Sequence, residues 1–432
     1  MKTYINPEKS TWAKILQRPA VDHKQLEATV QAVLDEVRQN GDAAVRKYTQ
    51  QFDGMLVNEL TVSETEIAEA VNAVGAELKA AIDLAVQNIA AFHSAQKEEI
   101  KKTETTAGVV CWRRSVAIET AGLYIPGGTA PLFSTLLMLG IPAVLAGCKE
   151  ILVCTPPGRD GKINPVILYV AQLIGLKKIY KIGGVQAIAA LAYGTATVAK
   201  ADKLFGPGNQ YVTCAKQLVN AEGVAIDMPA GPSELAVYAD ESCNAAFVAA
   251  DLLSQAEHGA DSQVILVTSS VSVIEKVKLE IEKQLDQLPR KAIAMQALQN
   301  SLAIVMQEEA GAFELLNAYA PEHLIIATEN AGTAAERVVN AGSVFLGHYS
   351  PESAGDYASG TNHTLPTNGY AKAYSGVSLD SFVKKITFQQ ISKTGIQHIG
   401  HAVELMAAAE GLDAHKNAVT IRLQEINKDH GI

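Results

Sequence analysis

Features that would assign this chain to a specialised class are scarce. It contains five cysteines among 432 residues, and no two of them have the Cys-x-x-Cys spacing of a thiolate metal site or a redox pair. An odd number at irregular spacing also argues against a disulfide framework. We therefore expect free thiols in a protein of the reducing cytoplasm. The cysteines are Cys111, Cys148, Cys154, Cys214 and Cys243.

Membrane and nucleic-acid signals are also missing. The first residues, MKTYINPEKSTW, have neither an apolar segment nor a small-residue cleavage site, and no stretch approaches the ~20 uninterrupted apolar residues of a membrane-spanning helix. Lys and Arg number 36 against 46 Asp and Glu, which gives a net charge of −10. We expect neither a membrane nor a nucleic-acid partner, and an anionic ligand would have to be bound by local backbone amides.

What the sequence does contain is a regular alternation of strand-like and helix-like segments. Residues 20–100 have helical periodicity, with one run at 67–92. From residue 109 onward, short β-rich runs alternate with helical segments of the length found in βαβ units, and they are numerous enough for two parallel, doubly wound sheets. The β-rich runs cover 150–155, 177–183, 201–206, 234–240, 263–269, 302–306, 323–328 and 343–347.

This alternation predicts an α/β fold with two Rossmann-like doubly wound domains, one inserted in the other, and small helical extensions at both ends. We expect an N-terminal extension over 1–21, a first α/β domain formed by 22–123 and 235–377, and an inserted second α/β domain over 124–234. The last segment, 378–432, is expected to be a C-terminal helical domain, because it has amphipathic runs near 401–409 and 412–427.

Three glycine-rich turns follow predicted strands and open predicted helices. They cover 125–128, 183–186 and 206–209. Helix N-termini at the carboxyl ends of parallel strands offer free amides to an anion such as a pyrophosphate. A single turn of this kind is more often structural, so the turns leave both interpretations open. The GxGxxG fingerprint and the GxxxxGK[ST] loop are both absent, so motifs alone do not identify a nucleotide.

Two groups of polar residues are candidates for metal binding. Gln255 and His258 are three residues apart on a predicted helix and share one face, although such a pair is more often a polar surface. The Gly- and Ser-rich segment 350–364 carries Asp356 and His363 and is either a site loop or a solvated surface loop.

Two further pairs are candidates for proton transfer or substrate contact. Glu322 and His323 stand directly before a predicted strand, where two proton carriers can meet, but a structural pair is the simpler alternative. Glu410 and His415 flank the start of the last helix, and His415 is also compatible with a core position. The HExxH motif is absent, so the residues alone indicate an α/β enzyme that is open to metal binding.

Taken together, longer strings in this sequence resemble the histidinol dehydrogenase family, in the same order and over essentially the whole chain. The strings are GLYIPGGTAPL, KIGGVQAIAALAYGT, FGPGNQYV, IDMPAGPSE, DLLSQAEHG, APEHL, GSVFLGHYSPESAGDYASGTNHTLPT and EGLDAHKNAV.

The resemblance implies a role for each candidate residue. The zinc ligands of the family match Gln255, His258, Asp356 and His415, and its catalytic pair matches Glu322 and His323. Substrate contacts, besides the metal ligands and His323, match Ser233, His363 and Glu410, and cofactor contacts match Tyr124, Gln186 and Asn209.

The implied reaction oxidises L-histidinol through L-histidinaldehyde to L-histidine, the last step of histidine biosynthesis, with one Zn²⁺ per subunit and two NAD consumed. A mixed oxygen and nitrogen ligand set leaves the zinc open to exchangeable ligands, so we expect it to orient the substrate. We expect His323 to remove the hydroxyl proton of the alcohol and Glu322 to activate water. The resemblance also implies a homodimer with shared active sites, held by the C-terminal domain, in which His415 serves the partner's zinc.

Three alternatives remain at this point. The nearest is a relative that oxidises another small polyol, such as a sulfonated propanediol, with zinc and NAD; Ser233, His363 and Glu410 favour histidinol instead. A second is a zinc hydrolase with Glu322 as the base that activates water. A third is a metal- or nucleotide-binding protein without catalytic activity.

Overall fold

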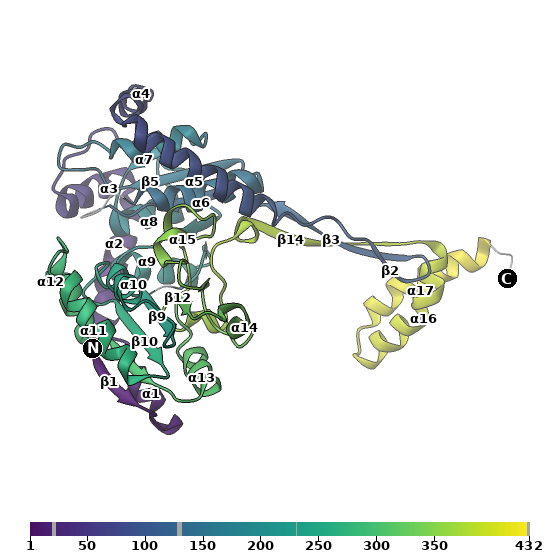
Figure 1. Cartoon of the computed structure of the whole chain (residues 1–432). Coiled ribbons are helices and arrows are strands. Elements are labelled where there is room, and N and C mark those ends of the chain that lie inside the picture. The colour runs from purple at the N-terminus through teal and green to yellow at the C-terminus, as the bar shows by residue number, and fades with distance from the viewer. Residues whose placement is uncertain (20–22, 128–131, 230, 430–432) are drawn as a thin grey trace. The chain divides into compact units, whose positions relative to one another are not determined.

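The computed structural model describes residues 1–19, 23–127, 132–229 and 231–429 (Figure 1). The chain forms two compact units. The first comprises Met1–Ala95 and Ile118–Phe382, and the second comprises Gln96–Ala117 and Val383–Ile432. Among the described residues, no helix is both long and apolar enough to cross a membrane.

The first unit contains a six-stranded parallel sheet in the order β1-β11-β10-β9-β12-β13. Alternate residues of its central strands enter two different cores: Leu235 and Val237 pack in one, and Ala236 and Tyr238 in the other. Both faces are therefore buried, as in a doubly wound sheet. The strands are β1 (Lys2–Ile5), β9 (Glu234–Ala239), β10 (Gln263–Thr268), β11 (Leu302–Val305), β12 (His323–Ala327) and β13 (Ser343–Leu346).

Helices that cover this sheet lie mostly between its strands in sequence. They are α10 (Ala245–Ala256), α11 (Val271–Leu285), α12 (Lys291–Gln299), α13 (Glu309–Tyr319), α14 (Ala331–Ala335) and α15 (Glu352–Tyr357). The short turns η1 (Lys9–Thr11) and α1 (Trp12–Ile15) follow β1, and Trp12 is buried in the core beside Ile265 and Phe313.

The same unit contains a five-stranded parallel sheet in the order β6-β5-β4-β7-β8. Its strands are β4 (Thr120–Tyr124), β5 (Glu150–Thr155), β6 (Lys178–Lys181), β7 (Lys203–Phe205) and β8 (Ala225–Ile226). The helices that connect them are α6 (Phe133–Ala146), α7 (Pro165–Leu173), α8 (Gly184–Tyr193) and α9 (Gln210–Ala221).

The N-terminal helices pack on this second sheet. Residues of α2 (His23–Asn40) and α3 (Asp42–Tyr48) share a core with Leu152 and Cys154 of β5. Residues of α4 (Glu64–Ala73) and α5 (Ala76–Ser94) share the opposite core with Val153. A π-helical turn, η2 (Thr49–Asp53), follows α3 and ends at Gly54, whose φ of 72° suits glycine.

In each sheet the chain reverses the side on which it adds strands, and ligands of open α/β sheets bind at such a reversal outside the carboxyl ends of the strands. In the five-stranded sheet the chain adds β5 and β6 on one side of β4 and then adds β7 on the other. In the six-stranded sheet it adds β10 and β11 on one side of β9 and then β12 on the other. The reversals therefore lie at β4/β7 and at β9/β12.

The second unit combines an antiparallel sheet with two helices (Figure 1). Its strands β2 (Thr103–Thr106), β3 (Val109–Ala117) and β14 (Val383–Ile391) pair in the order β14-β3-β2, and Trp112 stacks on Phe388 with ring centroids 5.5 Å apart. The helices are α16 (Lys393–Ala409) and α17 (Asp413–Asp429), which pack against each other.

The predicted α/β class with parallel, doubly wound sheets is confirmed, and each of the eight predicted β-rich runs contains a strand. Three local expectations were wrong. The N-terminal extension includes a strand, β1, because its backbone completes the edge beside β11. The C-terminal segment begins with β14, which pairs with β3. The helical run at 67–92 is two helices, α4 and α5, separated at Val74 and Gly75.

The predicted domain limits remain a proposal, but one group of segments that was predicted to form a single domain does not pack together. Residues 22–123 were expected to join 235–377. Instead α2 to α5 pack in the cores of the five-stranded sheet, and β4 is a central strand of that sheet. The reason is that α2 to α5 bury their apolar faces on helices and strands of the 124–234 segment.

Candidate active site

The Glu322–His323 pair lies at the amino end of β12, beside the first residue of β9. Glu322 Oε2 accepts a hydrogen bond of 2.9 Å from the backbone N–H of Glu234. His323 Nδ1 lies 3.3 Å from the backbone oxygen of Glu234. A carbonyl oxygen only accepts, so Nδ1 carries the proton and Nε2 keeps its lone pair. Both side chains are buried, and Nε2 of His323 has no hydrogen-bond partner among the residues that the structure describes.

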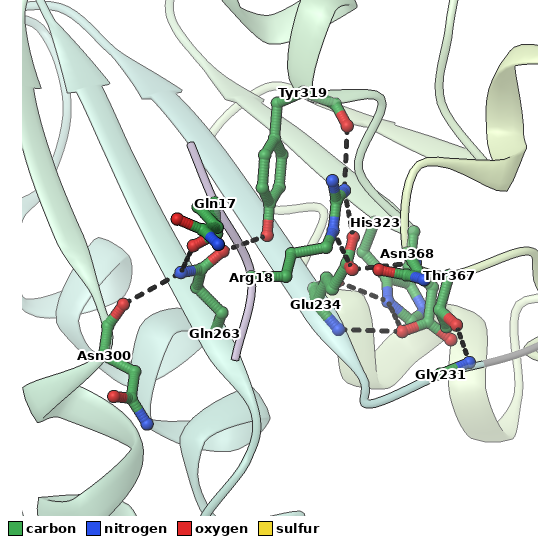
Figure 2. Close-up of polar contacts among 11 residues, drawn as sticks. Gln17, Arg18, Gly231, Glu234, Gln263, Asn300, Tyr319, His323, Thr367 and Asn368 are labelled. Atoms are coloured by element: carbon green, nitrogen blue, oxygen red, sulfur yellow. Dashed lines mark hydrogen bonds and ion pairs between the residues drawn. The ribbon is translucent and has the colours of Figure 1, made fainter. Parts of the chain in front are cut away.

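Glu234, which holds this pair through its backbone, is itself held by Arg18 (Figure 2). The guanidinium donates to both oxygens of the Glu234 carboxylate, at 2.7 Å for Nη2 to Oε2, and lies 4.0 Å above the ring of Tyr319. It also donates to the backbone oxygen of Tyr319 at 2.8 Å. The backbone N–H of Asn368 completes the cluster by donating to Glu234 at 2.8 Å.

Arg18→Gln should destabilise the protein by about 3 kcal/mol, because it leaves a buried carboxylate without its countercharge. The Glu234 side chain is 2% exposed and that of Arg18 is 17% exposed, so solvent cannot replace the ion pair. Urea unfolding measures the loss. Lys9→Gln is the control, since its ion pair with Glu314 is exposed and contributes about 0.5 kcal/mol at most. Equal stability of the two variants would contradict a structural role for the Arg18–Glu234 pair.

A cluster of side chains that could hold a metal ion faces this pair. One donor atom each from His258, Glu352 and Asp356 lies within 4.8 Å of the others. Glu352 and Asp356 are four residues apart on α15 and so share a face, while His258 follows the last turn of α10. Gln255, in that last turn, is 1% exposed, and its Oε1 has no hydrogen-bond partner in the described ranges of the chain.

Electrostatics in this cluster suit a divalent cation. Burial raises the pKa of Asp356 to about 7. Burial, followed by repulsion from Asp356 and Glu322, raises the pKa of Glu352 well above its ordinary value. Burial likewise raises the pKa of Glu322. Buried carboxylates that repel one another are stabilised by a dication, and carboxylate, amide and imidazole donors are ligands that zinc accepts. The residues therefore fit the implied metal.

The cluster also contacts the two histidines. His323 Nε2 lies 3.7 Å from Asp356 Oδ1, and burial lowers the pKa of His323 to about 3, so the ring is neutral. His363 Nδ1 lies 3.0 Å from the backbone oxygen of Asp356, and its Nε2 lies 3.1 Å from the hydroxyl of Thr135. Burial lowers the pKa of His363 to about 4. Ser233 directly precedes Glu234, at the same end of the sheet.

The three residues expected to contact a cofactor lie at the carboxyl ends of β4, β6 and β7, whereas the Glu322–His323 pair lies at the amino end of its strand. Tyr124 ends β4, and its hydroxyl accepts a hydrogen bond of 3.2 Å from the N–H of Gly184. Gln186 is buried in the first turn of α8, and neither atom of its side-chain amide has a hydrogen-bond partner within the described part of the chain. Asn209 caps α9 by accepting from the N–H of Tyr211 and of Val212, each at 3.1 Å.

A cavity of about 1040 Å³ opens beside these turns, and Tyr124, Gly184 and Asn209 line it. Of the first glycine-rich turn, 125–128, Gly128 lies outside the described residues. Gly206 in the third turn has a φ of 125°, and a Cβ there would lie 2.0 Å from the backbone oxygen of Tyr124. The turn therefore requires glycine, because the chain passes directly over the end of β4.

Two predicted site residues belong to the second unit. Glu410 directly follows α16, and His415 lies in the first turn of α17. Both side chains are exposed. The first unit by itself brings His258 and Asp356 together with the Glu322–His323 pair, and Gln255 lies in the last turn of the helix that His258 follows.

Three residues of this site were not predicted from the sequence: Arg18, Glu234 and Glu352. A signal existed only for Glu352, which stands four residues before Asp356, the spacing that places two side chains on one helix face. The Gly- and Ser-rich composition of 350–364 predicts a loop, whereas the structure has the helix α15 there, so the sequence gives this spacing no meaning. The contact of Arg18 with Glu234 spans 216 residues and leaves no local pattern.

Comparison with known proteins shows the family to which the chain belongs. A family model described as Histidinol dehydrogenase matches residues 16–423. The chain belongs to the histidinol dehydrogenase family. Curated histidinol dehydrogenases from Bacteroides fragilis and Bacteroides thetaiotaomicron are each 60% identical to it, over 428 and 426 residues, and in both cases the match covers 99% of this chain and 100% of the relative.

A solved structure extends the match to three dimensions. The crystal structure of histidinol dehydrogenase from Elizabethkingia anophelis aligns with a TM-score of 0.97 and 57% identity over 99% of each chain. The family resemblance of the sequence is thereby confirmed, and nothing supports a relative that acts on another polyol. The roles of individual site residues stay predictions.

Proposed function

We propose that this chain catalyses the four-electron oxidation of L-histidinol through L-histidinaldehyde to L-histidine, with two NAD as acceptors. The observation that carries the proposal is the buried Glu322–His323 pair in a member of the histidinol dehydrogenase family. Nε2 of His323 lies 3.7 Å from Oδ1 of Asp356, which belongs to the cluster of side chains that could hold a metal ion. We place the reaction in the cytoplasm, which the five free cysteines support.

His323 is the base in the alcohol step. Its Nδ1–H is directed to the oxygen of Glu234, which leaves the Nε2 lone pair to accept the hydroxyl proton as hydride leaves the carbon. Burial lowers the pKa of His323 and so weakens this base, and nearby carboxylates offset the effect by stabilising the imidazolium that forms. Asp356 lies 3.7 Å from Nε2 and Glu322 lies 3.7 Å from Nδ1.

Glu322 is the base in the aldehyde step, which starts from water and the aldehyde carbonyl. One carboxylate oxygen is fixed by the N–H of Glu234, so the other, Oε1, takes the proton of the attacking water. Because burial raises the pKa of Glu322, its carboxylate is a stronger base than an exposed glutamate. The resulting hydrate then loses hydride to the second NAD.

Gln255, His258 and Asp356 would hold zinc, with His415 as the remaining ligand. When bound, zinc supplies a Lewis acid that orients the imidazole and amine of the substrate. Ser233, His363 and Glu410 are assigned to contacts with the substrate. The neutral ring of His363 fits that role, because its Nδ1–H is already directed to the oxygen of Asp356.

The decisive test is the NADH yield when L-histidinol is the sole substrate. We expect two NADH per molecule of histidinol, with histidine as the product. A hydrolase or a binding protein would form no NADH, and a polyol dehydrogenase would respond only to its own substrate. Either result would overturn the proposal.

We further propose a homodimer in which His415 completes the site of the partner subunit. The exposed apolar side chains on the helices of the second unit support an interface there: Leu405 is 59% exposed, Met406 is 67% exposed and Ile421 is 51% exposed.

Mixing two inactive variants tests the shared site. A His415→Ala chain supplies an intact Glu322, and a Glu322→Gln chain supplies an intact His415, so heterodimers should contain one complete site of two. We expect about half of the wild-type activity per heterodimer, measured after separation by different affinity tags. Unmixed variants are the controls. Inactive heterodimers of verified composition would show that each chain builds its own site.

A further inference from the structure

Buried polar atoms without partners gather at the carboxyl ends of β5 and β6. Thr155, the last residue of β5, has a fully buried hydroxyl with no hydrogen-bond partner among the described residues. Both amide atoms of Gln186 and Oδ2 of Asp53 are also buried and have no partner in that part of the chain. Unpaired buried groups destabilise a protein, so their accumulation in one place indicates a polar ligand.

Asp53 brings a carboxylate into the cavity of about 1040 Å³ that Thr155 also lines. It ends the η2 turn, and Gly54 then turns the chain away with a φ of 72°. Its charge acts on the phenol of Tyr124 and contributes to the raised pKa of that group, after burial. Burial raises the pKa of Asp53 to about 6, so the carboxylate is charged at neutral pH.

The remaining walls of this cavity suit an aromatic base and a phosphate. Phe52 is 53% exposed, stacks on Tyr48 with centroids 5.5 Å apart and lines the cavity, so its ring is available for stacking on a base. Pro156 and Pro157 add apolar wall. The N-terminus of α8, ten residues long and beginning at Gly184, offers backbone amides to a phosphate.

The cavity wall includes none of the metal-binding residues and neither Glu322 nor His323, as far as the described residues show. The half of a dinucleotide that this cavity takes is therefore the half that does not react. For NAD that half is the adenosine, whose ribose carries two adjacent hydroxyls.

From this arrangement we propose that Asp53 binds the hydroxyls of the adenosine ribose, assisted by Thr155, and that it selects NAD against NADP. A carboxylate accepts hydrogen bonds from two adjacent hydroxyls, and it repels the phosphate that NADP carries on one of them. This inference rests on the proposed NAD-dependent function and adds the residue that distinguishes the two cofactors.

Calorimetric titration of the protein with NAD and with NADP, without substrate, measures the two dissociation constants. Wild-type protein should bind NAD about a hundredfold more tightly than NADP, because the carboxylate of Asp53 repels the extra phosphate of NADP. Asp53→Asn should weaken NAD about tenfold, as for loss of a hydrogen bond to a charged group, and reduce the preference to within about tenfold. Thr155→Val should weaken NAD about fivefold and keep the preference.

Asp160→Asn is the matched control, because Asp160 lies on the same cavity but is exposed, and its Oδ1 already accepts from the N–H of Lys162 at 3.1 Å. Its preference for NAD should equal that of the wild type. An unchanged preference in Asp53→Asn, or an equal change in Asp160→Asn, overturns the inference and leaves the proposed function standing. If Asp53→Asn does not fold, an unchanged affinity for NAD in Thr155→Val overturns it. Failure of wild-type protein to bind NAD overturns the proposed function, and the inference with it.

Discussion

Asp356→Asn and His258→Asn should each lose bound zinc and most of their activity. Both residues contribute a donor atom to a cluster within 4.8 Å, and removal of either leaves the dication with an incomplete set of ligands. Loss of an outer partner alone costs about 10- to 100-fold in metal affinity, so loss of a direct ligand should cost at least about 100-fold. Zinc content after gel filtration, measured by atomic emission, reports this directly.

Asp251→Asn is the matched control for this loss. Asp251 stands one helical turn before Gln255 on α10, and burial raises its pKa to about 7, but it is not among the clustered donors. It should keep its zinc, because coordination depends on the position of the donor atom and not on nearby charge alone. Full zinc retention in Asp356→Asn and His258→Asn would refute the assigned ligands.

Glu352 is a further acid in this cluster. It was not predicted, yet its carboxylate lies with the imidazole of His258 and the carboxylate of Asp356, and the residue is 1% exposed. Its Oε1 lies 3.8 Å from His323 Nδ1, so it also faces the Glu322–His323 pair. The structure thus adds a buried acid to a site for which the family resemblance supplied a different ligand set.

Much of the fold was predictable because its central strands are buried on both faces. Strands such as β9 and β10 consist of consecutive buried residues, and that requirement produces continuous apolar runs in the sequence. The strands that were missed lack this signal. β1 is largely exposed at the edge of its sheet, and β14 is exposed along most of its length, so pairing alone defines them.

The candidate site was predictable only in part, for a related reason. Local spacing predicted that Gln255 and His258 share one helix face, although α10 ends at Ala256 and His258 follows it. Adjacency joined Glu322 to His323. Tertiary contacts hold these residues in place. The backbone of Glu234 fixes the Glu322–His323 pair, and Arg18, from the N-terminal segment, neutralises the charge of Glu234. No periodicity in the sequence encodes such a contact, so the supporting residues had to come from the structure.

Glu322→Gln should slow aldehyde oxidation by about 10²- to 10⁴-fold, the usual contribution of a general base, and alcohol oxidation much less. The amide oxygen of glutamine can still accept from the N–H of Glu234, so the strand ends and His323 should keep their positions. Only the ability to take a proton from water is lost. Single-turnover NADH formation, started with histidinol or with histidinaldehyde, separates the two steps.

His323→Asn is the companion variant, and it should show the reverse preference. Its loss removes the Nε2 lone pair that takes the hydroxyl proton, so alcohol oxidation should fall by about 10²- to 10⁴-fold. Oxidation of histidinaldehyde should be less affected, because Glu322 still activates the water. Equal losses for the two substrates in both variants would mean that Glu322 and His323 act as one proton-transfer unit, since their side chains lie only 3.7 Å apart.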